Sequence, residues 1–213
     1  MQDRCKVESG SSNLIVTFNS DANHRPEWKR GSKFEWKSSL VDNTRMTINS
    51  DFLFLRDSKR RWYLDGICGT SKDLNETVYF LKKECETYEN VIFMGSSAGG
   101  YASILFGSLV EPGNVLAFTP QTDLKFARWS LPTRAKRGIP HKELAKYWNL
   151  RGVINQNVKY HVTCEDDDTN LLHAFHHYRN ISDFSNVHRL HPTNPGEMLK
   201  CGELEKFLVS HLI

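Results

Sequence analysis

One stretch near the middle of the chain limits the possible folds more than any other. Residues 91–94 (VIFM) form an apolar run of strand length and lead directly into Gly95-Ser96-Ser97-Ala98-Gly99-Gly100. A segment that is compatible with a helix continues from there to Val110. A strand can turn so abruptly into a helix only where small residues flank the turn. The stretch therefore predicts a buried strand, a tight turn around Ser97 and a helix that packs back on a sheet.

Further short apolar runs have the length of buried strands, and helical patterns lie between them. The runs are 14–18 (LIVTF), 51–55, 115–118, 158–164 and 187–190. Apolar residues at helical spacing predict a helix from Leu74 to Tyr88, which Thr70 or Ser71 can cap. Residues 171–178 and 203–212 are two more helical segments. This alternation predicts an α/β protein whose mostly parallel sheet is covered by helices on both faces.

Length and composition limit the class of protein. The 213 residues suit a single domain over residues 13–213, preceded by a polar, loose lead-in over residues 1–12. No stretch approaches the roughly 20 apolar residues that span a bilayer. A net charge of +3 and a pI near 8.5 make nucleic-acid binding an unfavoured function. The sequence does not indicate an oligomeric state.

The cysteines indicate the compartment. They are odd in number and widely spaced, which argues against a disulfide framework and a structural zinc site. The N-terminus carries no apolar segment of the kind found in signal peptides. We therefore expect a cytoplasmic protein. The five residues are Cys5, Cys68, Cys85, Cys164 and Cys201.

A basic segment interrupts the alternation of strands and helices at residues 125–151. Its only acidic residue is Glu143, and Trp129, Tyr147 and Trp148 are interleaved with its basic residues. We expect an insertion over one edge of the sheet that could serve as a cap, although a solvated pair of basic helices fits the pattern equally well. The basic residues are Lys125, Arg128, Arg134, Lys136, Arg137, Lys142, Lys146 and Arg151.

Ser97 is the candidate nucleophile, because Gly95–Gly99 matches G-x-S-x-G between a strand and a helix. A Gly-rich turn without catalysis is the alternative. A serine needs a histidine to take its proton and a carboxylate to orient that histidine, here in the chain order serine, acid, histidine. Asp168 is the favoured acid, and Asp166 and Asp167 remain open. His191 is the favoured base because it follows the strand 187–190.

The same reasoning leaves further alternatives. His188 is the rival base, although it sits inside the predicted strand and not at its end. The acidic residues could instead form a solvated turn that caps a helix. For the oxyanion hole, Ala98 would supply one N–H group, and the loop after 14–18, meaning Asn19 or Ser20, the other. His173, His176 and His177 lack an H-E-x-x-H pattern, so we predict no metal and no cofactor.

The strings VIFMGSSAGGYASILFGSLV and NVLAFTPQTDL resemble a group of bacterial α/β-hydrolase-like proteins associated with polysaccharide and glycan biosynthesis. Arg56-Asp57 and Trp62-Tyr63 upstream are similar to the pattern of that group, and the resemblance covers roughly residues 14–210. Two positions depart from it: Asn170 stands where the group has an aspartate, and Glu197 where it often has a histidine. The resemblance implies a three-layer α/β-hydrolase fold of minimal size and a Ser-Asp-His triad.

Two functions follow as hypotheses. In the first, the protein is a serine esterase or acyltransferase that acts on a small or carbohydrate-linked acyl ester through Ser97, Asp168 and His191. Gln121, just past the strand 115–118, could contact that substrate, and the basic segment could favour an anionic glycan. In the second, the departures at Asn170 and Glu197 reflect a non-catalytic domain that binds a glycan or a partner on the same scaffold.

Overall fold

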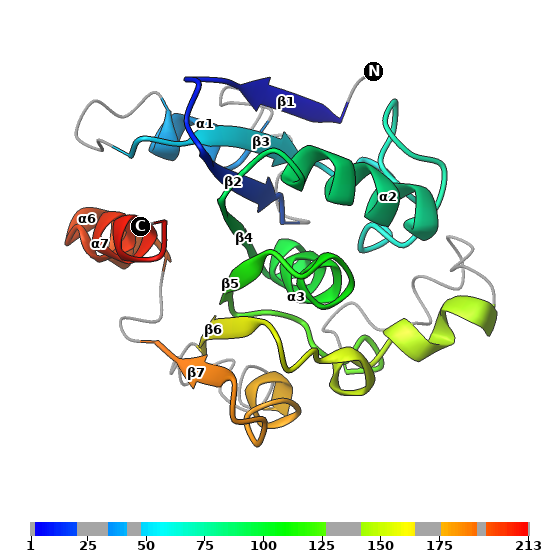
Figure 1. Ribbon diagram of the computed structural model, residues 1–213. Helices are drawn as coiled ribbons and strands as arrows, with labels where there is room; N and C mark the ends of the chain where they lie inside the picture. Colours follow the sequence, from blue (N-terminus) through cyan, green and yellow to red (C-terminus); the bar gives the residue numbers. More distant parts are fainter. Residues whose placement is uncertain are drawn as a thin grey trace, which may run out of the picture.

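The computed structural model describes residues 3–20, 34–41, 48–126, 142–164, 176–190 and 195–212. These residues build a seven-stranded sheet in the order β1-β3-β2-β4-β5-β6-β7 (Figure 1). Strand β1 is antiparallel to β3, and all other neighbouring strands are parallel. The strands are β1 (Arg4–Val7), β2 (Asn13–Phe18), β3 (Asp51–Leu55), β4 (Asn90–Ser96), β5 (Gly113–Phe118), β6 (Lys159–Thr163) and β7 (Val187–Arg189).

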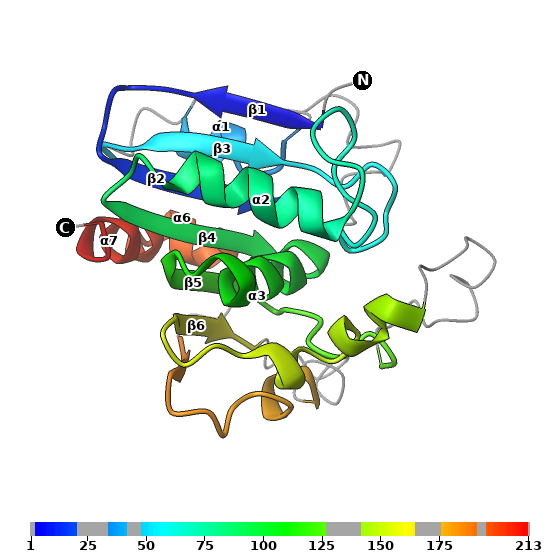
Figure 2. The same cartoon turned by 45° about the vertical axis from the view of Figure 1, so that its right-hand side comes forward.

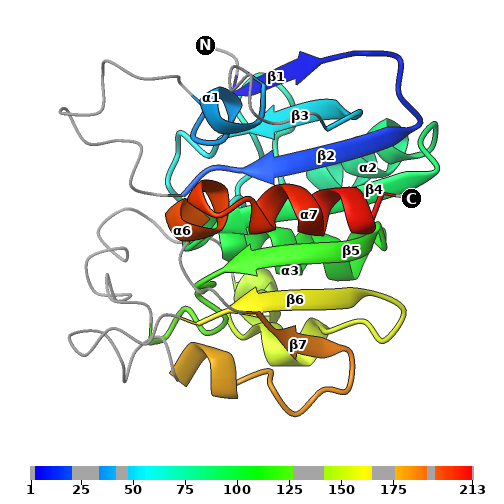
Figure 3. The ribbon, with the colours of Figure 1, turned by 90° about the vertical axis from the view of Figure 1, so that its left-hand side faces the viewer.

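Helices cover both faces of the sheet. One face carries α2 (Leu74–Cys85) and α3 (Ala98–Val110), as Figure 2 shows. The other carries α1 (Lys37–Leu40), α6 (Pro195–Lys200) and α7 (Glu203–Ser210), as Figure 3 shows. The predicted three-layer α/β architecture is therefore confirmed. None of the helices in these described ranges has both the length and the apolar character needed to cross a membrane.

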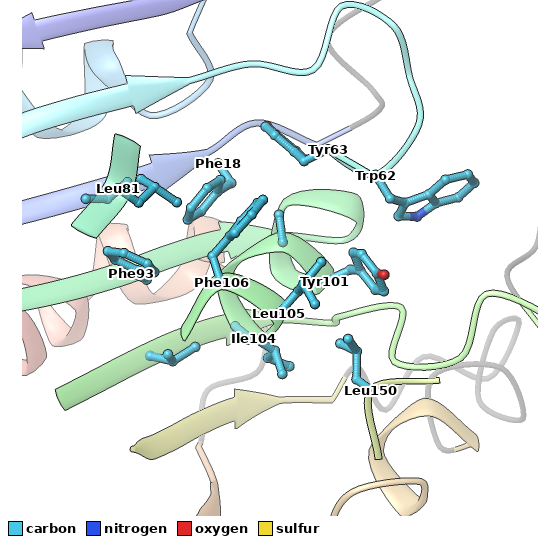
Figure 4. Close-up of a cluster of buried hydrophobic side chains, with 14 of the residues drawn as sticks. Phe18, Trp62, Tyr63, Leu81, Phe93, Tyr101, Ile104, Leu105, Phe106 and Leu150 are labelled. Atoms are coloured by element: carbon cyan, nitrogen blue, oxygen red, sulfur yellow. The ribbon is translucent and has the colours of Figure 1, made fainter. Parts of the chain in front are cut away.

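Strand β4 and helix α3 lie at the centre of this architecture because they are almost entirely apolar. Residues 98–108 of α3 are all buried. Phe106 on this helix stacks on Phe18 at the end of β2, with ring centroids 5.5 Å apart, and Tyr63 meets Phe18 edge-on at 5.4 Å (Figure 4). This aromatic cluster fixes the helix that follows Ser97 against the strand that precedes Asn19.

Two local features differ from what the sequence suggested. Residues 1–12, expected as a loose lead-in, contain the edge strand β1, and the buried carboxylate of Asp3 pairs with Arg56 at 2.7 Å. This strand was missed because its pairing depends on a residue more than fifty positions away. The cap of α2 is Asp73, whose Oδ1 accepts the N–H of Glu76 at 2.8 Å, because Ser71 instead bonds the Thr77 hydroxyl.

The basic segment 125–151 is described only in part, because residues 127–141 lie outside the described ranges. Its later part forms the 3₁₀ helices η3 (Lys142–Tyr147) and η4 (Leu150–Val153). The Tyr101 hydroxyl of α3 donates to the Tyr147 carbonyl at 2.6 Å. The N–H of Leu150 donates to the Thr122 carbonyl at 2.8 Å. This part of the segment is thus attached to α3 and to the chain after β5, and a cap over the site remains a prediction.

Candidate active site

The carboxyl ends of the parallel strands all meet at one edge of the sheet, where α/β proteins bind their ligands. Ser97 follows β4 at the middle of this edge. The loops that carry the predicted acid and the predicted histidine follow β6 and β7, which lie two and three strands away from β4. The topology thus directs these three parts of the sequence to the same edge.

The backbone of Ser97 has a conformation that is rare for a residue with a side chain. Its φ is 53° and its ψ is −112°. Its N–H donates to the Phe118 carbonyl at 2.9 Å, and its carbonyl accepts the N–H of Tyr101 at 2.9 Å. A strained conformation of this kind costs about 1–3 kcal/mol, and such strain clusters at functional sites. The β4–α3 connection therefore has the geometry of a nucleophile elbow, with Ser97 at its tip.

Glycines make this turn possible because the helix starts in contact with two strand ends. A Cβ atom on Gly99 would lie 2.1 Å from the Phe18 carbonyl oxygen. A Cβ atom on Gly95 would lie 2.4 Å from the carbonyl oxygen of Gly99. No side chain fits at these distances. The two glycines of the G-x-S-x-G pattern are thus required by close approach on either side of Ser97.

A small pocket that is partly open to solvent lies beside the elbow. Ala98 lies at the first turn of α3, where backbone N–H groups have no partner within the helix and the helix dipole favours negative charge. The structure thus brings the loop after β2 and the residue after Ser97 to one pocket, and their role as an oxyanion hole remains a prediction. The lining residues are Asn19, Ser20, Asp57, Arg60, Trp62, Tyr63 and Ala98.

The backbone N–H groups of this loop have other partners than the prediction assumed. The N–H of Asn19 donates to the Leu55 carbonyl at 3.0 Å, because the pairing of β2 with β3 continues one residue past Phe18. The N–H of Ser20 donates to Oε2 of Glu35 at 2.7 Å. Asn19 therefore contributes to the pocket wall, while its own N–H is used within the sheet. Glu35 was not identified from the sequence, since nothing in its local pattern marks it.

A strained loop also contributes to the wall of the pocket. In residues 57–63, which we call the arch, Arg60, Trp62 and Tyr63 have φ values of 57°, 56° and 64°. Oδ2 of Asp57 accepts the N–H of Tyr63 at 2.9 Å and thereby holds the arch in this conformation. The Tyr63 hydroxyl lies 3.0 Å from the carbonyl oxygen of Asn19. The arch thus connects the end of β3 to the loop after β2.

The arch also reaches Gln121, the predicted substrate contact. The Trp62 indole N–H donates to Oε1 of Gln121 at 2.8 Å. An indole N–H can only donate, so it fixes the orientation of the Gln121 amide, with the oxygen toward Trp62 and the nitrogen away from it. Gln121 itself is buried, next to a residue that lines the pocket. Its contact with a substrate remains a prediction.

Two carboxyl groups near the pocket have perturbed acidities. Burial raises the pKa of Glu35 and that of Asp57. Burial, together with the charges of these two residues, raises the pKa of Tyr63 well above its usual value. Groups with perturbed pKa values gather at functional sites more often than elsewhere. In the described part of the chain, no cluster of histidine, cysteine or acidic side chains could hold a metal ion.

The predicted partners of Ser97 lie outside the described residues. Asp168, its alternatives Asp166 and Asp167, and His191 belong to the ranges 165–175 and 191–194. They remain predictions.

The rival base, His188, is described and lies elsewhere. It pairs with His161 inside the β6–β7 ladder, with ring centroids 5.6 Å apart. His161 in turn contacts Phe207 of α7, with ring centroids 4.8 Å apart. His188 is therefore on the sheet face under α7 and not at the edge that carries Ser97.

No protein-family model matches this sequence, and no curated protein matches it. Solved structures are similar in fold. The capsule O-acetyltransferase of Neisseria meningitidis serogroup A matches with a TM-score of 0.63 and 16% identity over 99% of this chain and 92% of that chain. The serine hydrolase FphF of Staphylococcus aureus matches with a TM-score of 0.63 and 8% identity over 95% and 84%. The esterase PF2001 of Pyrococcus furiosus matches with a TM-score of 0.55 and 16% identity over 98% and 85%. The chain thus has the α/β-hydrolase fold.

Proposed function

We propose that the protein is a serine esterase or acyltransferase. Ser97 attacks an ester carbonyl, His191 takes the serine proton and returns it to the leaving group, and Asp168 orients His191. Water, or a sugar hydroxyl in the transfer reaction, then resolves the acyl-enzyme. The observation that carries this proposal is the left-handed backbone of Ser97 at the β4–α3 turn. A serine is kept at a position that favours glycine, which points to a role for its hydroxyl.

The oxyanion would lie at the start of α3. The N–H of Ala98 would supply one donor. Of the two predicted candidates for the other, the N–H of Asn19 bonds the Leu55 carbonyl, and the N–H of Ser20 becomes available to an oxyanion only when it leaves Oε2 of Glu35. Asn19, Ser20 and Ala98 line the same pocket as the arch, which supports this assignment. Donors fixed in place before the reaction stabilise the developing charge without having to reorganise, and each is worth about 10²–10³-fold in rate.

The proposed substrate is a small or carbohydrate-linked acyl ester. The fold likeness to a capsule O-acetyltransferase supports a carbohydrate, and a mutant of that enzyme has been solved in complex with CoA. An anionic substrate is supported by Arg60, which lines the pocket. The neighbouring Arg61 does not line the pocket and pairs with Asp65 at 2.9 Å. The cytoplasmic location expected from the cysteines is part of the same proposal.

The test is a comparison of two adjacent serines. Wild type should hydrolyse short-chain nitrophenyl esters or acetylated sugars, or transfer acetyl groups from acetyl-CoA to sugars. Ser97→Ala should lose this activity by about 10³-fold or more, while Ser96→Ala, the matched control at the last position of β4, should retain most of it. A folded wild type without hydrolysis or transfer, whose glycan binding survives Ser97→Ala, would instead support the binding domain.

A further inference from the structure

We propose that Asp57 is a substrate-binding residue, which accepts a hydrogen bond from a hydroxyl group on the carbohydrate part of the ester. This inference rests on the proposed function. Among the described residues that line the pocket beside Ala98, Asp57 is the only acidic one, and it is 8% exposed. Its Oδ1 is buried and accepts no hydrogen bond from the described part of the chain. One carboxylate oxygen of Asp57 is therefore left for a donor on a ligand.

The other carboxylate oxygen is used by the arch. Oδ2 of Asp57 accepts the N–H of Arg61 and, at 2.9 Å, that of Tyr63. The Asp57 carbonyl accepts the N–H of Arg60 at 3.1 Å. These bonds fix the orientation of the carboxyl group, because a backbone N–H needs an oxygen on the side that faces it. Oδ1 is the oxygen that the arch leaves without a partner.

A buried oxygen of this kind needs an explanation. A buried acceptor without a donor is destabilising, and more so where it carries charge. Such groups are therefore few in folded proteins. An asparagine at position 57 could accept the N–H groups of the arch through its single oxygen. The arch alone thus does not require a carboxylate, and the second oxygen of Asp57 points to a ligand.

The surroundings of Asp57 favour a neutral donor. Arg60 lines the same pocket, and its positive charge would repel an ammonium group on a ligand. A hydroxyl group donates a hydrogen bond without adding a charge. Because Ala98 directly follows Ser97, this hydroxyl would belong to the part of the substrate next to the reacting ester. Carbohydrate esters carry hydroxyl groups on the carbons that neighbour the acylated one.

The experiment compares kcat/KM for an acetylated methyl glycoside with kcat/KM for nitrophenyl acetate, which has no hydroxyl group. Asp57→Asn should lower the value for the glycoside about 10–100-fold more than the value for nitrophenyl acetate. The asparagine oxygen must replace Oδ2 to meet the N–H groups of the arch, so an amide nitrogen, which cannot accept, replaces Oδ1.

The matched control is Asp51→Asn. Oδ1 of Asp51 also accepts backbone N–H groups, those of Ser9 at 2.6 Å and Gly10 at 3.1 Å, but at the start of β3 and not at its end. This variant should leave the ratio of the two kcat/KM values unchanged.

Deoxy analogues of the glycoside, each lacking one hydroxyl group, give a second test that needs no variant. Wild type should lose about 10–100-fold in kcat/KM with the analogue that lacks the hydroxyl bound by Asp57. The same analogue should cost Asp57→Asn much less, because the bond is already absent. For acetyl transfer, the analogues without their acetyl group serve as acceptors. If Asp57→Asn does not fold, the wild-type series decides alone.

The outcomes separate this inference from the proposed function. A ratio that changes in Asp57→Asn but not in Asp51→Asn, with one deoxy analogue poor for wild type, would support the inference. An equal loss for both esters would overturn it, because Asp57 would then only order the arch. An unchanged ratio would also overturn it, since the amide nitrogen can replace a protonated Oδ1 that donates.

The response of wild type provides the remaining outcomes. Deoxy analogues that all react at the rate of the parent glycoside would overturn the inference. Hydrolysis of nitrophenyl acetate without reaction of any glycoside would overturn it too, and would leave the esterase in place. A folded wild type that hydrolyses neither ester and transfers no acetyl group would refute the proposed function, and the inference with it.

Discussion

Replacing Ser97 with glycine should abolish activity and give a protein that is more stable than the Ser97→Ala variant. The backbone of Ser97, with φ of 53° and ψ of −112°, is one that glycine adopts without strain. The reference is Ser97→Ala, which keeps a Cβ atom and therefore keeps the strain. Both variants lack the hydroxyl, so the loss of its contacts cancels in the comparison. The difference between them isolates the cost of holding a side chain at the tip of the elbow.

The magnitude follows from two opposing terms. Relief of the strained conformation contributes about 1–3 kcal/mol in favour of glycine. Glycine loses about 0.5–1 kcal/mol relative to alanine, because its unfolded chain has more freedom. The free energy of unfolding of Ser97→Gly should therefore exceed that of Ser97→Ala by about 1 kcal/mol. In a domain of this size that difference raises Tm by about 2–4 °C.

Urea titrations of the two variants, followed by tryptophan fluorescence and by circular dichroism, measure this difference. Coincident transitions with equal slopes would allow the two free energies to be compared directly. If Ser97→Gly proved equal to or less stable than Ser97→Ala, the elbow would not store strain at Ser97. The main structural argument for a nucleophile at that position would then be lost.

Further predictions concern the elbow, the sheet and the pocket. Gly99→Ala places a Cβ atom 2.1 Å from the Phe18 carbonyl oxygen and should cost about 1–3 kcal/mol in urea unfolding; wild-type stability would contradict the contact. Burial lowers the pKa of His161 from its ordinary value near 6.5 to about 4, so the unfolded chain binds the proton first as the pH falls. The free energy of unfolding should therefore fall by about 3 kcal/mol as the pH falls from about 6.5 to about 4. His161→Phe should remove this part of the pH dependence, and an equal pH dependence in the variant and the wild type would refute the prediction. Arg60→Ala should lower kcat/KM for an anionic ester about tenfold more than it lowers kcat/KM for a neutral ester. Arg61→Ala should leave the ratio of the two kcat/KM values unchanged. Equal effects of Arg60→Ala on both esters would exclude Arg60 from recognition.

The elbow could be predicted because its signals are local. The apolar run before Gly95 and the small residues around Ser97 are adjacent in the sequence, and the structure places a strand, a turn and a helix there. Gly95 and Gly99 also indicate that the backbone of the turn approaches its neighbours closely, because a side chain at either position would collide with a carbonyl oxygen. The strands other than β1 were predictable for the same reason, as each lies in a short apolar run.

The surroundings of the elbow could not be predicted, because they depend on distant partners. Glu35 forms hydrogen bonds with Asn19 and Ser20, and its segment has no regular period in the sequence. In the arch, the positive φ values of Arg60 and Trp62 do not fall on glycines, so composition gives no sign of them. The hydrogen bonds of Trp62 with Gln121 and of Tyr63 with Asn19 join residues that are far apart in the sequence. Secondary-structure propensity reflects the neighbours of a residue in the sequence. Glu35 and Tyr63 instead bond Asn19, which follows the end of a strand far away in the sequence.

The central claim is that Ser97 is an activated nucleophile, and covalent labelling tests it most directly. Pure protein is incubated with a fluorophosphonate probe, and the adduct is located by peptide mass spectrometry. We predict one adduct, on Ser97, which is lost in His191→Ala and retained in His188→Ala. Folded protein that carries no adduct on Ser97, or an adduct that persists at the same rate in His191→Ala, would contradict the account.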